Sequence, residues 1–176
     1  DTQGSSSDSL QNAADTVKKG VIMYSEGMAV PKDMQGILAG RVHNALYYPP
    51  FLNLNKFIQP GFAVFRVAEL YKEPIQREFA TSFFNGYGTE INIMAAGQPE
   101  WVEKQYAYLG KTTLLLRQLS ENFNSANATP LIPTNADSIW VNQWSTDNRI
   151  VYTVYATIPQ GYKNDLFEVN QIRKIA

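Results

Sequence analysis

The stretch FAVFRVAELYKEPIQREFATSFFNGYGTEINIMA, residues 62–95, decides the fold class of this chain. It begins with a continuous apolar run at 62–68, which is typical of a strand buried in a parallel sheet. Residues 74–84 follow as a helix with proline at its first position, where proline is well tolerated. Residues 85–88 contain two glycines that break the helix, and 89–95 read as another strand. This order predicts a βαβ unit.

The residues before this unit predict a similar alternation. Residues 9–19 carry apolar side chains at helical spacing, and Gly20 suits the position just after the end of a helix. Residues 21–25 predict a short buried strand. A second helix is expected from residue 31 or 33 to 44, although two internal glycines weaken it. Three prolines within 47–61 predict an irregular aromatic loop.

The C-terminal half changes from helical to strand periodicity. Residues 99–123 form the strongest helix, with one broad apolar stripe, and residues 124–137 are a linker rich in Asn, Ala, Pro and Thr. Three antiparallel strands are then expected at 139–144, 149–158 and 166–169.

The expected fold class is therefore α/β followed by antiparallel β, with an α/β region at 1–123, the linker at 124–137 and a β region at 138–176. Three parallel strands cannot close a barrel, and three antiparallel strands make half a sandwich. We therefore expect the chain to be the C-terminal part of a larger enzyme, or to assemble with other chains.

Composition excludes several classes of protein. The chain has 176 residues, 44% of them hydrophobic, and a net charge of -1, so no overall basic field attracts nucleic acid or anionic lipid. No apolar run is long enough to span a membrane. Cysteine is absent and His43 is the only histidine, which excludes disulfide scaffolds, thiolate metal sites and multi-histidine zinc sites. Tyrosine and tryptophan are abundant, as suits a protein that meets sugars.

The order of the elements resembles the C-terminal part of retaining-type (β/α)8 glycoside hydrolases. VIMYSEG at 21–27 resembles a barrel strand that delivers a catalytic or sugar-binding glutamate, and Asp1-Thr2 resembles the end of the preceding strand. SIWVNQWSTDNRIVYTVY at 138–155 is similar to the first hairpin of the C-terminal β-domain in bacterial polysaccharide-degrading enzymes. The resemblance implies the last βα units of a (β/α)8 barrel plus part of a C-terminal β-sandwich.

The resemblance also implies catalytic carboxylates. Active-site side chains of this fold follow the carboxyl ends of the strands, and glycosidic cleavage uses two carboxylates. Glu26 is the first candidate, although it could simply be a loop residue that caps the next helix. Asp1 could be the second carboxylate or a disordered chain end. Glu69 and Glu90 are weaker candidates, and Glu90 stands at the wrong end of its expected strand.

Other residues are candidates for substrate binding. Tyr47, Tyr48 and Phe51 lie in the proline-rich loop, where aromatic faces could stack on sugars or equally pack back on the body of the protein. His43 could recognise a sugar hydroxyl, but a helix-dipole partner at a helix C-terminus is the favoured interpretation. Arg66 could pair with an acid inside the barrel, and a structural ion pair is the simpler expectation.

The leading hypothesis is a glycoside hydrolase, or a C-terminal fragment of one, that cleaves a polysaccharide or oligosaccharide by carboxylate acid/base chemistry. It needs no cofactor, no compact metal motif appears, and its partners are a carbohydrate and the remainder of a larger enzyme or other chains. The expected location is secreted, periplasmic or at a bacterial cell surface. The alternative is a non-catalytic carbohydrate-binding or surface-assembly protein that uses Trp140, Trp144 and Tyr152.

Overall fold

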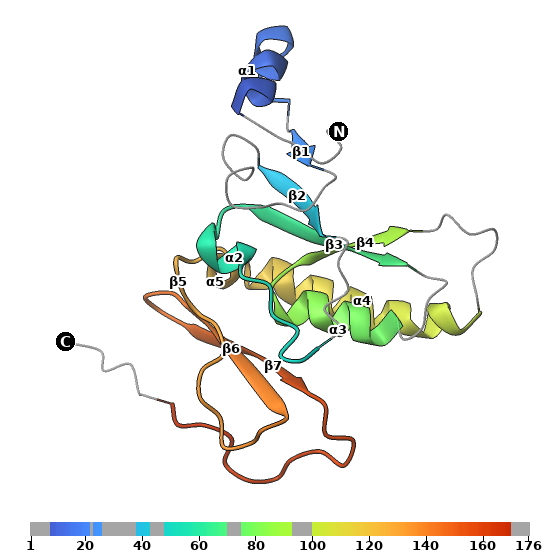
Figure 1. The fold of residues 1–176 in the computed structure, drawn as a ribbon, viewed down its shortest axis with the longest axis vertical. Coiled ribbons are helices and arrows are strands. Elements are labelled where there is room, and N and C mark those ends of the chain that lie inside the picture. The colour runs from blue at the N-terminus through green and yellow to red at the C-terminus, as the bar shows by residue number, and fades with distance from the viewer. Residues whose placement is uncertain are drawn as a thin grey trace.

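The structure, a computed structural model, is a mixed α/β fold with one parallel and one antiparallel sheet (Figure 1). It describes residues 8–21, 23–25, 38–42, 48–69, 75–92 and 100–169. Within these ranges no helix combines the length and the apolar character that a membrane span requires.

Four parallel strands form the first sheet in the order β1-β2-β3-β4, which is also their order in the chain. Their bounds are Tyr24–Ser25 for β1, Ala39–Val42 for β2, Ala63–Glu69 for β3 and Gly88–Asn92 for β4. The predicted strands at 62–68 and 89–95 are confirmed within one residue at the ends that the structure describes, whereas only the last two residues of the strand predicted at 21–25 form β1. Sequential parallel order is what successive βα units produce.

Helices cover one face of this sheet. The βαβ helix α3 spans Ile75–Phe84 and packs on β3, while the long helix α4 spans Glu100–Gln118 and packs on α3 (Figure 1). Ala68, Ile75 and Phe79 form the buried centre of this layer. A second cluster of Val42, Phe62, Val64 and Tyr87 covers the same face nearer the amino ends of the strands. Burial of these side chains is the main stabilisation of the layer.

Three helix predictions are confirmed and one is wrong, and the helix predicted at 74–84 is α3. α1 spans Asp8–Val17 and is followed by Gly20 with φ of 83°, as its capping position predicts. The predicted helix at 99–123 is α4 followed by the short α5 at Ser120–Phe123. The helix expected up to residue 44 is contradicted, because 39–42 are strand β2. Gly40 and Val42 are buried in the sheet between β1 and β3, so pairing with neighbours overrides the local helical pattern.

The antiparallel sheet has the order β5-β6-β7. β6 at Ile139–Ser145 and β7 at Ile150–Ala156 form the predicted hairpin. The third strand is β5 at Asn127–Thr129, inside the predicted linker, and the strand expected at 166–169 is contradicted. That segment turns back to the loop before β6 instead, where the Asn135 main-chain N–H donates to the Leu166 oxygen at 2.8 Å.

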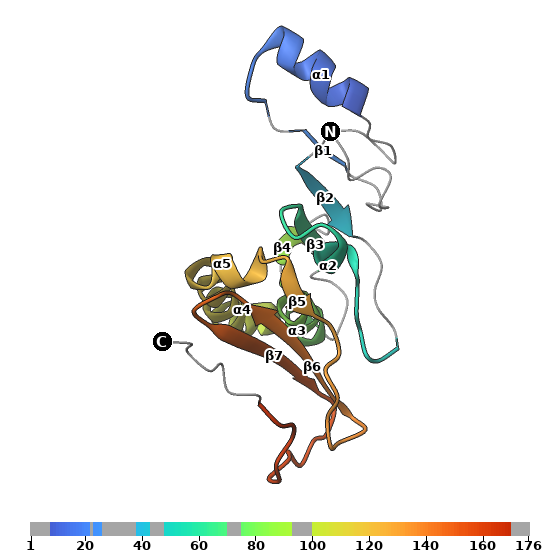
Figure 2. The same cartoon turned by 90° about the vertical axis from the view of Figure 1, so that its left-hand side faces the viewer.

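The two sheets share a core at the amino ends of the parallel strands. Trp144 of β6 is completely buried, and its ring stacks on Phe57 at a centroid distance of 4.7 Å and packs against Phe123 at 5.2 Å. Phe57 belongs to α2, a single turn at Asn55–Ile58. The hairpin lies beside α3, while α1 lies at the far end of the molecule, as Figure 2 shows.

Candidate functional site

The parallel sheet has two chemically different faces. Register partners in a parallel sheet share a face, and residues two apart along a strand share it too. Tyr24 of β1 pairs with Ala39 of β2. Two residues further along β2, Arg41 pairs with Phe65 of β3, and two residues further along β3, Val67 pairs with Glu90 of β4. This face therefore carries an arginine and a glutamate. The other face carries the apolar residues that α3 and its neighbours bury.

Arg41 and Glu90 form a two-pronged ion pair across β3. The Arg41 Nε donates to Glu90 Oε2 at 2.7 Å, and its second prong reaches Glu90 Oε1. Their side chains are 17% and 30% exposed, respectively. The guanidinium also lies 6.0 Å from the centre of the Tyr24 ring, which itself packs against Phe65. A planar guanidinium held in this way presents fixed positive charge at a partly open face.

Polar residues occur at or directly after the carboxyl ends of all four parallel strands. β3 ends at Glu69 and β4 at Asn92, which are register partners. In the sequence, Glu26 follows the last residue of β1 and His43 follows the last residue of β2. Asp1, Glu26, His43 and Tyr47 lie outside the described residues. Ligand sites of parallel α/β proteins lie at this edge of the sheet.

Arg66 lies on the opposite face of the sheet, toward α3. Its side chain is 1% exposed and pairs with Glu78, which also binds Arg77 at 2.6 Å. Burial lowers the pKa of Arg66, and the Glu78 charge opposes that shift. The structural ion pair expected as the simpler alternative is therefore present, and burial against α3 separates Arg66 from the face that carries Arg41 and Glu90.

Phe51 packs on the body of the protein. It is 6% exposed, with its ring 5.0 Å from Tyr155 and the Arg77 guanidinium 4.6 Å from its centre. The Asn85 side-chain amide, just before β4 begins, donates to the Phe51 oxygen at 2.8 Å. This part of the loop therefore lies at the amino edge of the sheet, opposite the edge where a barrel active site forms.

The substrate-binding expectation for Phe51 is therefore wrong, because the ring contributes to the shared core instead. Tyr48 behaves differently and is 85% exposed.

The three residues of the alternative hypothesis, a carbohydrate-binding protein, lie in different environments. Trp144 is in the core, so its proposed contact with a ligand is contradicted. Trp140 is half-buried, with its ring 6.4 Å from Phe51. Tyr152 lies on the other face of the hairpin and lines a surface recess.

Sequence reasoning missed Arg41 because the residue fell within the predicted helix. The signal that could have found it is the run Ala-Gly-Arg-Val at 39–42, in which a glycine disfavours a helix and a β-branched residue favours a strand. Among the described residues, no three acidic or histidine side chains gather in a way that could hold a metal ion.

Comparison with known family models, with curated proteins and with solved structures found no match to this chain.

Proposed function

We propose that this chain is the C-terminal part of a (β/α)8 glycoside hydrolase that cleaves a polysaccharide or oligosaccharide, with its site at the carboxyl edge of the parallel sheet. The observation that carries the proposal is the arrangement of that sheet. Its strands follow one another in chain order, its helices cover one face, and the other face carries Tyr24 and the Arg41–Glu90 pair. A barrel interior is the environment that would use such a face.

In this proposal Glu26 is the acid/base or the nucleophile. It follows Ser25, the partner of Gly40, and Arg41 is the next residue of β2. Arg41 would hold the carboxylate in place, while Glu90 fixes the guanidinium from the other side. The second carboxylate would come from Asp1, from Glu69 or from the remainder of the enzyme, because hydrolysis requires two.

The same proposal covers the antiparallel sheet, the substrate and the location of the protein. The antiparallel sheet would be part of a C-terminal β-sandwich domain, the substrate a plant or host polysaccharide, and the location secreted, periplasmic or at a bacterial cell surface. The chemistry needs no cofactor, because two carboxylates and a water suffice.

The test starts with the mass of the native polypeptide, measured by size exclusion with mass spectrometry, followed by assays of that species on a panel of polysaccharides. Glu26→Gln should lower turnover by roughly 10²-fold or more, because a catalytic carboxyl is lost. Arg41→Met should lower turnover by a smaller factor and change its pH profile. Glu103→Gln is the control, because Glu103 is exposed on α4.

Two outcomes would overturn the proposal. One is full turnover in Glu26→Gln. The other is a native 19.8 kDa monomer that releases no sugar from any polysaccharide.

A further inference from the structure

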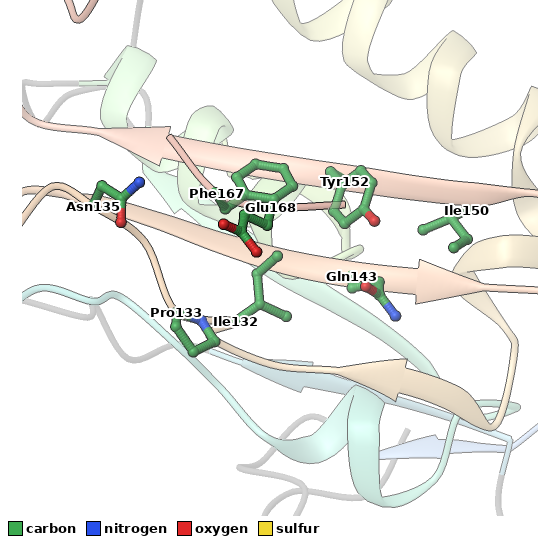
Figure 3. A pocket seen from close by; sticks show the side chains of 8 residues that line it. All are labelled: Ile132, Pro133, Asn135, Gln143, Ile150, Tyr152, Phe167 and Glu168. Atoms are coloured by element: carbon green, nitrogen blue, oxygen red, sulfur yellow. The ribbon is translucent and has the colours of Figure 1, made fainter. Parts of the chain in front are cut away.

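A recess of about 500 Å³ lies on the outer face of the antiparallel sheet (Figure 3). Its volume falls in the range of about 300–1,000 Å³ that is usual for small-molecule sites. Its lining comes from the loop before β6, from both hairpin strands and from the segment after β7. The lining residues are Ile132, Pro133, Asn135, Gln143, Ile150, Tyr152, Phe167 and Glu168.

The recess is separate from the protein core. Gln143 and Tyr152 are direct register partners on the outer face of the hairpin. The next residue of β7, Thr153, is 2% exposed on the inner face, where its hydroxyl donates to the Phe84 oxygen at 2.9 Å. Side chains alternate between the two faces of a strand, so changes to the lining leave the core contacts in place.

Aromatic rings form one wall of the recess. Tyr152 and Phe167 pack together with ring centroids 4.9 Å apart and an angle of 52° between the planes. Both are half-buried, so each ring keeps some exposed surface. Aromatic surfaces of this kind bind the C–H faces of pyranose rings, because both partners are apolar there and polar at their rims.

The polar groups of the recess keep free hydrogen-bonding capacity. Gln143 Nε2 donates to the Ser145 hydroxyl at 3.0 Å, and no contact within the described chain occupies its amide oxygen. Asn135 Nδ2 donates to the Asp165 oxygen at 3.2 Å, which likewise leaves its own amide oxygen available within those residues. The Glu168 side chain is exposed and receives no hydrogen bond from any residue that the structure describes. Amide and carboxylate oxygens accept hydrogen bonds from hydroxyl groups.

The charge of the lining selects among ligands. Among the described residues that line the recess there is one carboxylate and no lysine or arginine. A phosphate or an acidic sugar would meet Glu168 with no compensating cation from the described lining, which is unfavourable. A hydroxyl-rich neutral ligand meets aromatic surface and acceptors together.

We propose that this recess binds a neutral oligosaccharide of pyranose units, at a site separate from the carboxyl edge of the parallel sheet. The proposal rests on the recess alone and stands whether or not the chain belongs to a hydrolase.

The test is titration of the protein, carrying Glu26→Gln so that no turnover intervenes, with hexasaccharides of β-1,4-linked glucose, xylose and mannose. Hexagalacturonate serves as the acidic probe. Binding is followed by calorimetry and by NMR of the side-chain amides of Gln143 and Asn135. We expect at least one neutral hexasaccharide to bind and to shift both amides, and hexagalacturonate to bind more weakly.

Variants locate the binding. Tyr152→Ala should weaken binding by about tenfold, because it removes the aromatic wall. Gln143→Ala should weaken it by a smaller factor. Val154→Ala is the matched control, because Val154 is exposed on the same face of β7 but does not line the recess. Far-UV circular dichroism and the Tm establish that each variant is folded.

Three results would overturn the proposal: no binding of any neutral hexasaccharide at millimolar concentration, unchanged binding by a folded Tyr152→Ala, or tighter binding of hexagalacturonate than of the neutral probes. Loss of hydrolysis in the Glu26 variant with binding intact would uphold this site independently of the catalytic proposal.

Discussion

The side-chain amide of Asn142 donates to the main-chain oxygen of Phe84 at 2.9 Å, which joins β6 to the last residue of α3. The Asn142 carbonyl oxygen accepts from the Leu131 N–H at 3.0 Å, so both ends of the amide are used. Asn142 is completely buried. Such an amide ties together three segments that are distant in sequence, and its loss would leave the Leu131 N–H without its partner, while the Phe84 oxygen would keep the hydrogen bond from Thr153.

Asn142→Ala should therefore lower the free energy of unfolding by about 1–3 kcal/mol, because it removes both hydrogen bonds and leaves the Leu131 N–H unpaired. Urea unfolding measures the change. Asn148→Ala, at an exposed turn position, should change stability by less than about 0.5 kcal/mol. Equal effects of the two substitutions would contradict the role of the buried amide.

Gly86→Ala should destabilise the protein more than Gly161→Ala does. Both glycines have positive φ, of 67° and 73°, so both variants carry the same backbone strain. Only at Gly86 would the new Cβ meet side chains, at 3.1 Å from both Phe123 and Trp144, whereas the space around Gly161 is open. The difference in Tm between the two variants isolates this packing contribution, and the near-UV circular dichroism signal of the aromatic core should change only in Gly86→Ala.

Lys56 should make stability rise with pH in the alkaline range. Its Nζ donates to the Pro60 oxygen and to Asn124 Oδ1, both at 2.6 Å, and burial lowers its pKa from 10.5 to about 8. Between pH 8 and 10.5 the folded chain has released a proton that the unfolded chain still holds, so folding gains stability as pH rises.

The measurement for Lys56 is unfolding of the wild type and of Lys56→Met between pH 7 and 10.5. Across this range the free energy of unfolding of the wild type should rise relative to that of the variant by up to about 3 kcal/mol. Lys163→Met, at an exposed position, should follow the wild type at every pH. A constant difference between the wild type and Lys56→Met would show that Lys56 has an ordinary pKa in the folded protein.

The two ion pairs of the parallel sheet should differ in their effect on folding. Glu78→Gln removes the carboxylate that forms the ion pair with the buried Arg66 guanidinium, so a loss of about 3 kcal/mol is expected. Glu90→Gln breaks a pair that is partly exposed to water, so a change of about 1 kcal/mol or less is expected. Guanidinium chloride masks charge, so urea is the denaturant for both. A larger loss for Glu90→Gln would reverse the assignment of which pair stabilises the fold.

The βαβ unit and the hairpin could be predicted because local patterns and tertiary contacts agree there. The alternation of Tyr152, Thr153, Val154 and Tyr155 places Thr153 and Tyr155 toward α3, where they contact Phe84. β2 was missed, because the strand signal in its four residues is too short to outweigh the helical spacing before it until β1 and β3 lie beside it. β5 could not be predicted either, because three residues carry too little pattern to distinguish a strand from a linker.

Site prediction failed where a residue type fits two environments. An aromatic residue in a proline-rich loop suits a sugar or a core, and only the contacts of Phe51 with Tyr155 and Arg77 decide between them. Arg66 was easier, because an arginine between apolar strand residues requires a buried partner, which α3 supplies.

The shared core at the amino ends of the parallel strands also has a consequence for how this sequence can change. Trp144, Phe57, Phe123 and Gly86 fit around one another, so a substitution at any one of them is tolerated only with a compensating change at another. These four positions therefore change together or not at all as the sequence diverges.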